Sequence, residues 1–196
     1  MPLVETIKQT FQNCRIDNQL CTLQIKDSHV KIVFEDKSIK PVFHVLNHIK
    51  RYASGENFVV IDFGEYEEKL YQIKTEEVKE IIERFNTVIK QFAKRKKEWA
   101  EMRKFEGERI IGNERVSCLI RLESESLIFE MKNGETTIVN MKDIKTYQWD
   151  DNGFTFITPR GQQVENVIET CDGYKLYLAV GAFINEIVAK NINKGN

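Results

Sequence analysis

The sequence predicts an α+β chain of two tandem domains, each a bent antiparallel β-sandwich or barrel closed by a C-terminal helix, with a long helix joining them. Three observations predict this class. A pattern recurs after about 95 residues, each copy is a series of short β-rich segments followed by an amphipathic helix, and helical periodicity continues across the junction. We therefore place the domains at residues 1–97 and 98–196.

The repeat is clearest where HIKRYASGENF, from residue 48, is set beside DIKTYQWDDNGF, from residue 143. An ungapped overlay of residues 18–52 on 113–147 gives eight identities in 35 positions, and several further apolar positions coincide. One extra residue in the second turn would then align Phe58 with Phe154. Coincidence between two β-rich segments is the alternative, but a unit of this length suits a small domain better than a solenoid repeat.

The first copy opens with Val4, Ile7 and Phe11 at helical spacing. Turn signals then separate alternating and β-branched segments, which predict strands. From residue 78 to 92 the apolar period is 3.6, and Thr75 is a suitable N-cap for this closing helix. The predicted strands of this copy cover residues 21–25, 29–35, 40–46, 49–52, 56–63 and 69–75.

The second copy repeats this order, and Asn133-Gly134 is a strong hairpin signal. Its closing helix is predicted from about Asp172 to Lys190. At the junction, apolar periodicity continues through Trp99, Met102 and Phe105, which predicts one continuous helix of about 28 residues. The predicted strands lie near residues 115–122, 125–131, 135–140, 143–148, 153–158 and 164–169.

Composition favours a globular cytoplasmic protein. Hydrophobic residues make up 41% of the chain, and the net charge of −1 provides no global attraction to nucleic acid. No apolar run is long enough to span a bilayer, and the first residues lack the pattern of a signal peptide. The four cysteines form no CxxC pair, which favours free thiols in a reducing compartment.

No pattern indicates catalysis. His44 and His48 have a spacing that could bind a metal on a helix, but this segment is predicted as strand and has no acidic or cysteine partner nearby. There is no nucleophile signature and no phosphate-binding glycine loop. We expect no metal site, no cofactor and no enzymatic activity.

Two features leave alternatives open. The basic run Lys94, Arg95, Lys96 and Lys97 is either a solvated helix face or a contact for anionic lipid headgroups. Nucleic acid is disfavoured, because aromatic and basic residues are not interleaved as in an RNA-binding sheet. Trp149, predicted in a turn, either folds back onto its domain or remains exposed as an anchor for a partner.

Residues 58–92, FVVIDFGEYEEKLYQIKTEEVKEIIERFNTVIKQF, resemble the closing part of the third lobe of a FERM domain, most like that of talin. The matching positions include Asp62-Phe63-Gly64 and the helix that follows. IKRY, from residue 49, resembles the fifth strand of that lobe, with Tyr52 where talin-like proteins usually carry Trp. The first two FERM lobes are absent, and the second copy takes the place of further lobes.

The resemblance implies the pleckstrin-homology/phosphotyrosine-binding (PH/PTB) superfold, a bent seven-stranded sheet closed by one helix. Members of this family bind receptor tails by adding the peptide as a strand beside strand five, and some bind phosphoinositides. No convincing arginine pair marks a phosphotyrosine site here. Carried over, the peptide-binding positions are Lys50, Arg51, Tyr52, Ala53 and Ser54 in copy one and Tyr147, Gln148 and Trp149 in copy two.

We therefore expect a non-enzymatic adaptor or scaffold that binds a cytoskeletal or receptor-tail protein at the actin cytoskeleton or adhesion machinery. Its expected location is the cytoplasm, at the cell cortex or the membrane. The alternative is a peripheral membrane module that binds phosphoinositides through Lys94–Lys97. A nucleic-acid partner is not expected, and no oligomeric state is predicted.

Overall fold

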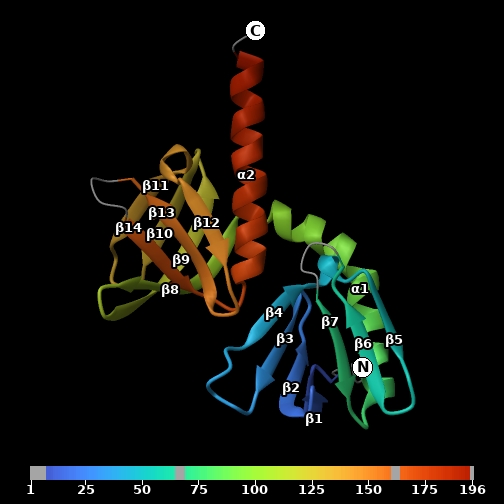
Figure 1. The fold of residues 1–196 in the computed structure, drawn as a ribbon. Helices are drawn as coiled ribbons and strands as arrows, with labels where there is room; N and C mark the ends of the chain where they lie inside the picture. The colour runs from blue at the N-terminus through green and yellow to red at the C-terminus, as the bar shows by residue number, and fades with distance from the viewer. Residues whose placement is uncertain (1–7, 65–68, 160–163, 195–196) are drawn as a thin grey trace, which may run out of the picture. The chain divides into compact units, whose positions relative to one another are not determined.

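The computed structural model of this chain describes residues 8–64, 69–159 and 164–194. The chain divides into two compact units between Ala93 and Lys94. Each unit holds one antiparallel sheet of seven strands, and a helix follows the last strand of each sheet (Figure 1). The predicted fold class, two tandem PH/PTB-like sandwiches each with a C-terminal helix, is confirmed.

In the first unit the strands are arranged in the order β4-β3-β2-β1-β7-β6-β5. Each neighbouring pair is antiparallel. All of these pairs join strands that are consecutive in the chain, except β1 and β7, which join the two halves of the sheet. The elements are β1 Thr10–Ile16, β2 Gln19–Ile25, β3 His29–Phe34, β4 Val42–Val45, the short 3-10 helix η1 Leu46–His48, β5 Arg51–Ser54, β6 Phe58–Asp62, β7 Leu70–Lys74 and α1 Val78–Glu101.

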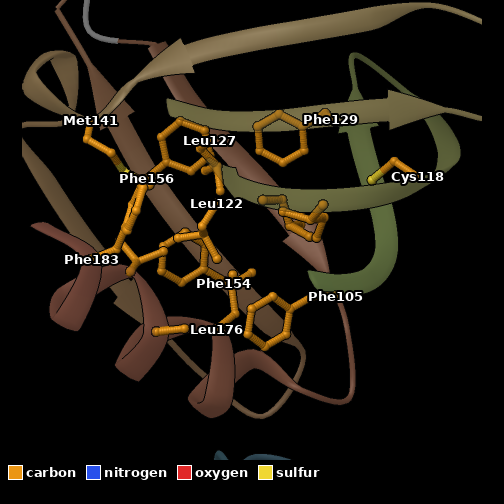
Figure 2. Close-up of a cluster of buried hydrophobic side chains, with 14 of the residues drawn as sticks. Phe105, Cys118, Leu122, Leu127, Phe129, Met141, Phe154, Phe156, Leu176 and Phe183 are labelled. Carbon is orange, nitrogen blue, oxygen red and sulfur yellow. The ribbon is translucent and has the colours of Figure 1, made fainter. Parts of the chain in front are cut away.

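The second unit repeats the same topology in the order β11-β10-β9-β8-β14-β13-β12. Its core combines phenylalanine rings with aliphatic side chains, and the rings of Phe129 and Phe156 stack with centroids 6.1 Å apart (Figure 2). The elements are β8 Lys104–Ile111, β9 Glu114–Glu123, β10 Ser126–Met131, β11 Thr136–Asn140, the 3-10 helix η2 Met141–Asp143, β12 Thr146–Trp149, β13 Gly153–Thr158, β14 Val164–Glu169 and α2 Gly173–Lys194.

The helix α1 begins where the sequence predicts it. The Thr75 hydroxyl accepts a hydrogen bond from the Glu77 backbone N–H at 3.1 Å, which satisfies a donor at the start of the helix. Its apolar stripe buries Ile81, Phe85, Val88 and Phe92. The helix ends at Glu101 instead of continuing to Phe105, so the continuous helix is shorter than predicted.

The first strand of each unit was not predicted. Phe11, assigned to an opening helix from its spacing, lies in β1, and Val4 and Ile7 lie outside the described residues. The cause is a β-bulge: Asn13 has φ 57°, and the pairing with β2 shifts between Phe11 and Cys14. The extra residue of the bulge places the inward-facing side chains of Phe11 and Cys14 three positions apart, and residues on one face of a helix have the same spacing.

The prediction for Phe105 is also wrong, for a different reason. It was placed at the end of the joining helix, but it lies in β8, where it is buried in the core of the second unit. Gly107 interrupts the apolar alternation of this strand at a point where a Cβ would lie 2.9 Å from the Glu169 carbonyl oxygen. Gly107 allows this close approach of the neighbouring backbone, but it has no side chain. It therefore weakens the apolar alternation from which a strand is predicted.

The hydrogen bonds of the two units repeat, including those around the fifth strands. The Lys50 N–H donates to the Asp62 carbonyl at 2.8 Å, and the Lys145 N–H donates to the Ile157 carbonyl at 3.0 Å. The turns that follow have equal lengths, since Gly55 pairs with Phe58 as Asp150 pairs with Gly153. The prediction of one extra residue in the second turn is therefore wrong, and Gly153, not Phe154, occupies the position of Phe58.

Strand pairing also corrects the overlay of the second and third strands. Followed across each sheet from the fifth strand, the registers make Cys21 equivalent to Cys118 and Phe34 equivalent to Met131. The ungapped overlay had matched Phe34 with Phe129, two residues away. A shift of two residues keeps every side chain on the same face of a strand, so the apolar pattern still coincided.

Candidate functional site: the open edges of β5 and β12

The strand β5 lies at the end of its sheet. Among the described strands it pairs with β6 alone, from Arg51 opposite Asp62 to Ser54 opposite Val59. Its other side is an edge with unpaired backbone groups, and such an edge is a template for a further strand. The sheet thus offers the element that the resemblance implied.

The turn after β5 determines which backbone groups face this edge. The Gly55 N–H donates to the Phe58 carbonyl at 2.9 Å, so Gly55 and Phe58 form a hydrogen-bonded pair. Hydrogen-bonded and non-hydrogen-bonded pairs alternate along an antiparallel ladder. Arg51 and Ala53 therefore direct their backbone groups to β6, and Tyr52 and Ser54 direct theirs to the open edge.

Tyr52 anchors β5 to the closing helix. Its ring stacks on Phe85 with centroids 5.2 Å apart, and its hydroxyl donates to the Asn86 side-chain oxygen at 2.8 Å. Tyr52 is half-buried by these contacts, but Ala53 and Ser54 are exposed. The polar edge is thus held at a fixed distance from α1.

The start of β5 is held by a charge pair. Arg51 Nε donates to Asp62 Oδ2 at 2.9 Å, and the other Asp62 oxygen accepts from the Gly64 backbone N–H at 2.9 Å. The Gly64 hydrogen bond, followed by that of Arg51, lowers the pKa of Asp62. Lys50, just before the strand, is exposed. Asp62 belongs to the motif that carries the resemblance, but no sequence pattern indicates its role in orienting Arg51.

Residues 5–93 match the family model of the PTB domain (IRS-1 type). PTB domains are non-catalytic modules that bind peptide segments of partner proteins, by adding a strand to a sheet edge. The match is consistent with an adaptor role for the chain, and it supports the PH/PTB-like fold of the first unit. A comparison with curated proteins gave no match.

The strand β12 forms the corresponding edge of the second unit. The Asp150 N–H donates to the Gly153 carbonyl at 3.0 Å, so the same alternation directs the backbone groups of Tyr147 and Trp149 outward. Gln148, between them, is exposed and faces β13 with its backbone. The two copies therefore present edges with the same hydrogen-bonding pattern.

The side chains at the β12 edge differ from those at β5. Trp149 lies in the strand, not in a turn as predicted, and its ring packs against Tyr174 of α2 at 4.8 Å. Tyr147 packs against Tyr177 at 5.2 Å. Burial raises the pKa of Tyr147, and it raises that of Tyr174 to about 12, so both hydroxyls stay neutral. Trp149 has folded back onto its domain and occupies the position of Ser54.

The basic run lies in α1, within the second unit. Lys94, Lys96 and Lys97 are exposed, Arg95 is half-buried, and Lys94 Nζ lies 3.8 Å from a Glu98 carboxylate oxygen. Four consecutive helical residues point about 100° apart, so these charges do not converge on one point. No helix among the described residues is long and apolar enough to cross a membrane.

Three of the cysteines and His44 are buried within the two units. Cys14, Cys21 and Cys118 are buried, and burial raises the pKa of each thiol, to about 11 for Cys21. A thiol of this kind is a poor nucleophile. His44 is buried beside Phe63 with ring centroids 4.2 Å apart. Within the described part of the chain, no three His, Cys, Asp or Glu side chains are grouped to hold a metal ion.

Proposed function

We propose that the chain is a non-enzymatic adaptor that binds an extended segment of another protein along the open edge of β5. The outward backbone groups of Tyr52 and Ser54 are the observation that carries the proposal. They would donate to and accept from the backbone of the bound segment, which gives affinity without a sequence requirement. Lys50 and Arg51, exposed at one end of the strand, would favour a segment with acidic residues there.

The match to the PTB domain (IRS-1 type) supports the binding mode but not the partner. For the partner we propose a cytoskeletal or receptor-tail protein in the cytoplasm, at the actin cytoskeleton or the adhesion machinery beneath the membrane. The likeness of residues 49–95 to the third FERM lobe of talin-like proteins supports this part of the proposal.

The edge can be tested by removing one backbone donor. Ser54→Pro deletes an N–H that faces the open edge, and proline is tolerated on the solvent side of an edge strand. Ser54→Ala removes only the side chain and is the matched control. The unchanged full chain and both variants are first used to capture partners from a cell lysate. The bound segment of a captured partner is then synthesised as a peptide, and its affinity for each protein is measured by fluorescence polarisation.

We expect Ser54→Ala to bind the peptide as the unchanged chain does, and Ser54→Pro to lower the affinity for the peptide by about tenfold or more. Circular dichroism checks that both variants fold. Equal binding by a folded Ser54→Pro variant would overturn the β5 site. A loss caused by Trp149→Ala instead, with Ser54→Pro unaffected, would assign the binding to the β12 edge.

A phosphoinositide-binding membrane module is the second candidate. The exposure of Lys94, Lys96 and Lys97 favours it. Co-sedimentation with phosphoinositide-containing vesicles, with and without charge reversal of these three lysines, separates the two functions. Vesicle binding that is lost on charge reversal, in a protein that captures no peptide, would replace the adaptor by the membrane module.

A further inference from the structure

A hollow in the second unit lies at positions where the described part of the first unit carries aromatic rings. It has a volume of about 450 Å³ and lies among the ends of β8, β11, β13 and β14. This volume is within the range of about 300–1,000 Å³ that small-molecule sites occupy. Its lining includes Arg109, Ser126, Asn140, Thr158 and Asn166.

The equivalent region of the first unit is filled with aromatic rings. There, His44 stacks on Phe63 at 4.2 Å, and its Nε2 lies 3.0 Å from the Tyr71 hydroxyl. Phe63 and Tyr71 pack edge to face at 6.0 Å. Three large side chains thus occupy this end of the first sandwich.

Strand registers identify what replaces these rings in the second unit. Tyr52 and Tyr147 are equivalent, and the pairings lead from them to Tyr71 and Asn166. By the same route Phe63 corresponds to Thr158, His44 to Val139 and Ile16 to Arg109. The substitutions remove three rings and place a guanidinium where the first unit has a buried isoleucine. The hollow is therefore a consequence of how the two copies diverged.

Arg109 points inward over the core. Its guanidinium carbon lies 5.0 Å from the centre of the Phe129 ring, and its Nη2 donates to the Asn166 side-chain oxygen at 3.1 Å. Both partners are uncharged, and among the described residues no carboxylate forms an ion pair with Arg109. Burial lowers the pKa of Arg109, yet an arginine stays charged in proteins. A partly desolvated cation with spare donors is stabilised by an anion.

Neutral polar groups surround this cation. Thr158 is 9% exposed, and its side chain lines the hollow. Ser126 is 8% exposed and donates only a long bond of 3.4 Å to the Ser124 carbonyl. A hydroxyl that lines a hollow can donate a hydrogen bond to a ligand oxygen held there. Asp143, the acidic residue of the lining, is exposed at the rim.

We propose that this hollow binds a small ligand with an oxyanion, a carboxylate or a phosphate group, held by Arg109 and the Thr158 hydroxyl. The exposed Asp143 carboxylate at the rim selects a ligand whose outer end carries hydrogen-bond donors. The site is in the second unit, so it does not depend on peptide binding at β5. It gives the second copy a role of its own.

The test uses the full chain and two simple probes, inorganic phosphate and propionate, at constant ionic strength. Backbone amide NMR shifts of β8 and β14 are followed during titration. We expect saturable shifts at Arg109 and Asn166, and none at Tyr71, the equivalent position in the filled unit. Arg109→Gln should weaken binding by about tenfold or more, and Arg109→Lys should retain part of it. Lys190→Gln, the same charge change on exposed α2, should leave binding unchanged.

A second variant fills the hollow without changing charge. Thr158→Phe places there the residue that the first unit has at this position, and it should abolish binding in a folded protein. Binding to phosphoinositide-containing vesicles is measured separately for the unchanged chain and for Arg109→Gln. If Arg109→Gln loses vesicle binding, a lipid headgroup is the source of the oxyanion. If vesicle binding is unchanged, the ligand is a free small molecule. The proposal is overturned if neither probe gives saturable shifts, or if Arg109→Gln and Lys190→Gln bind alike.

Discussion

At the scale of single residues, equivalent positions of the two copies have acquired different chemistry. His44 is buried among aromatic rings, and Val139 takes its place in the second unit. Tyr52 bonds to Asn86, but Tyr147 has Gly181 at the position of that asparagine. The fold accepts these exchanges because each unit closes its own core. The exchanges change which polar groups of each unit remain available to bind a ligand or a partner.

His44 makes the stability of the first unit depend on pH. Burial is the main cause that lowers its pKa from 6.5 to about 4, with smaller contributions from His48 and Lys69. Between these values the unfolded chain binds a proton that the folded chain does not, so the free energy of unfolding falls as the pH falls. From pH 7 to pH 5 the loss should be about 2 kcal/mol, and it should end below pH 4, where both states are protonated.

His44→Phe should remove this component of the pH dependence. Urea unfolding of both proteins at pH 7 and pH 5 measures it as a difference, in which the contributions of shared carboxylates cancel. An equal loss of stability in both proteins would show that His44 is protonated in the folded state.

At the scale of elements, the turn between β12 and β13 is packed against the start of α2. A Cβ on Gly153 would lie 1.9 Å from the Ile168 carbonyl oxygen, and one on Gly173 would lie 2.3 Å from the Gly153 carbonyl oxygen. These neighbours are backbone atoms, which cannot rotate away. The glycine that stands at the position of Phe58 is thus required by the close approach of strand and helix.

Gly153→Ala should therefore lower the free energy of unfolding of the second unit by about 3 kcal/mol or more. Gly112→Ala is the control: Gly112 has φ 60° but no atom near its added Cβ, so it should cost only about 1–2 kcal/mol. Urea unfolding followed by tryptophan fluorescence gives both values. Equal losses would mean that the backbone at Gly153 can shift.

At the scale of the whole molecule, the chain offers one probe that follows the second unit alone and one that follows both units. Both of its tryptophans, Trp99 and Trp149, lie in the second unit, so tryptophan fluorescence follows that unit. Circular dichroism follows both. Phe129→Ala should lower the stability of the second unit by about 3–5 kcal/mol and move the fluorescence midpoint.

Phe85→Ala truncates a fully buried ring of the first unit. We expect it to move part of the dichroism transition and leave the fluorescence midpoint in place. A fluorescence midpoint that moves equally in both variants would show that the two units unfold as one cooperative block, coupled through α1.

The repeat, the closing helices and twelve of the fourteen described strands could be predicted from the sequence, because turn signals and apolar periods are local properties of the chain. The sequence also located the strand-five segments. The first strand of each unit required the tertiary structure, because a bulge in one and a central glycine in the other interrupt the apolar alternation. The registers, the direction of backbone groups at the β5 edge and the hollow around Arg109 were decided by the tertiary structure too. Each depends on which residues, distant in the chain, come to lie opposite one another, and no local pattern carries that information.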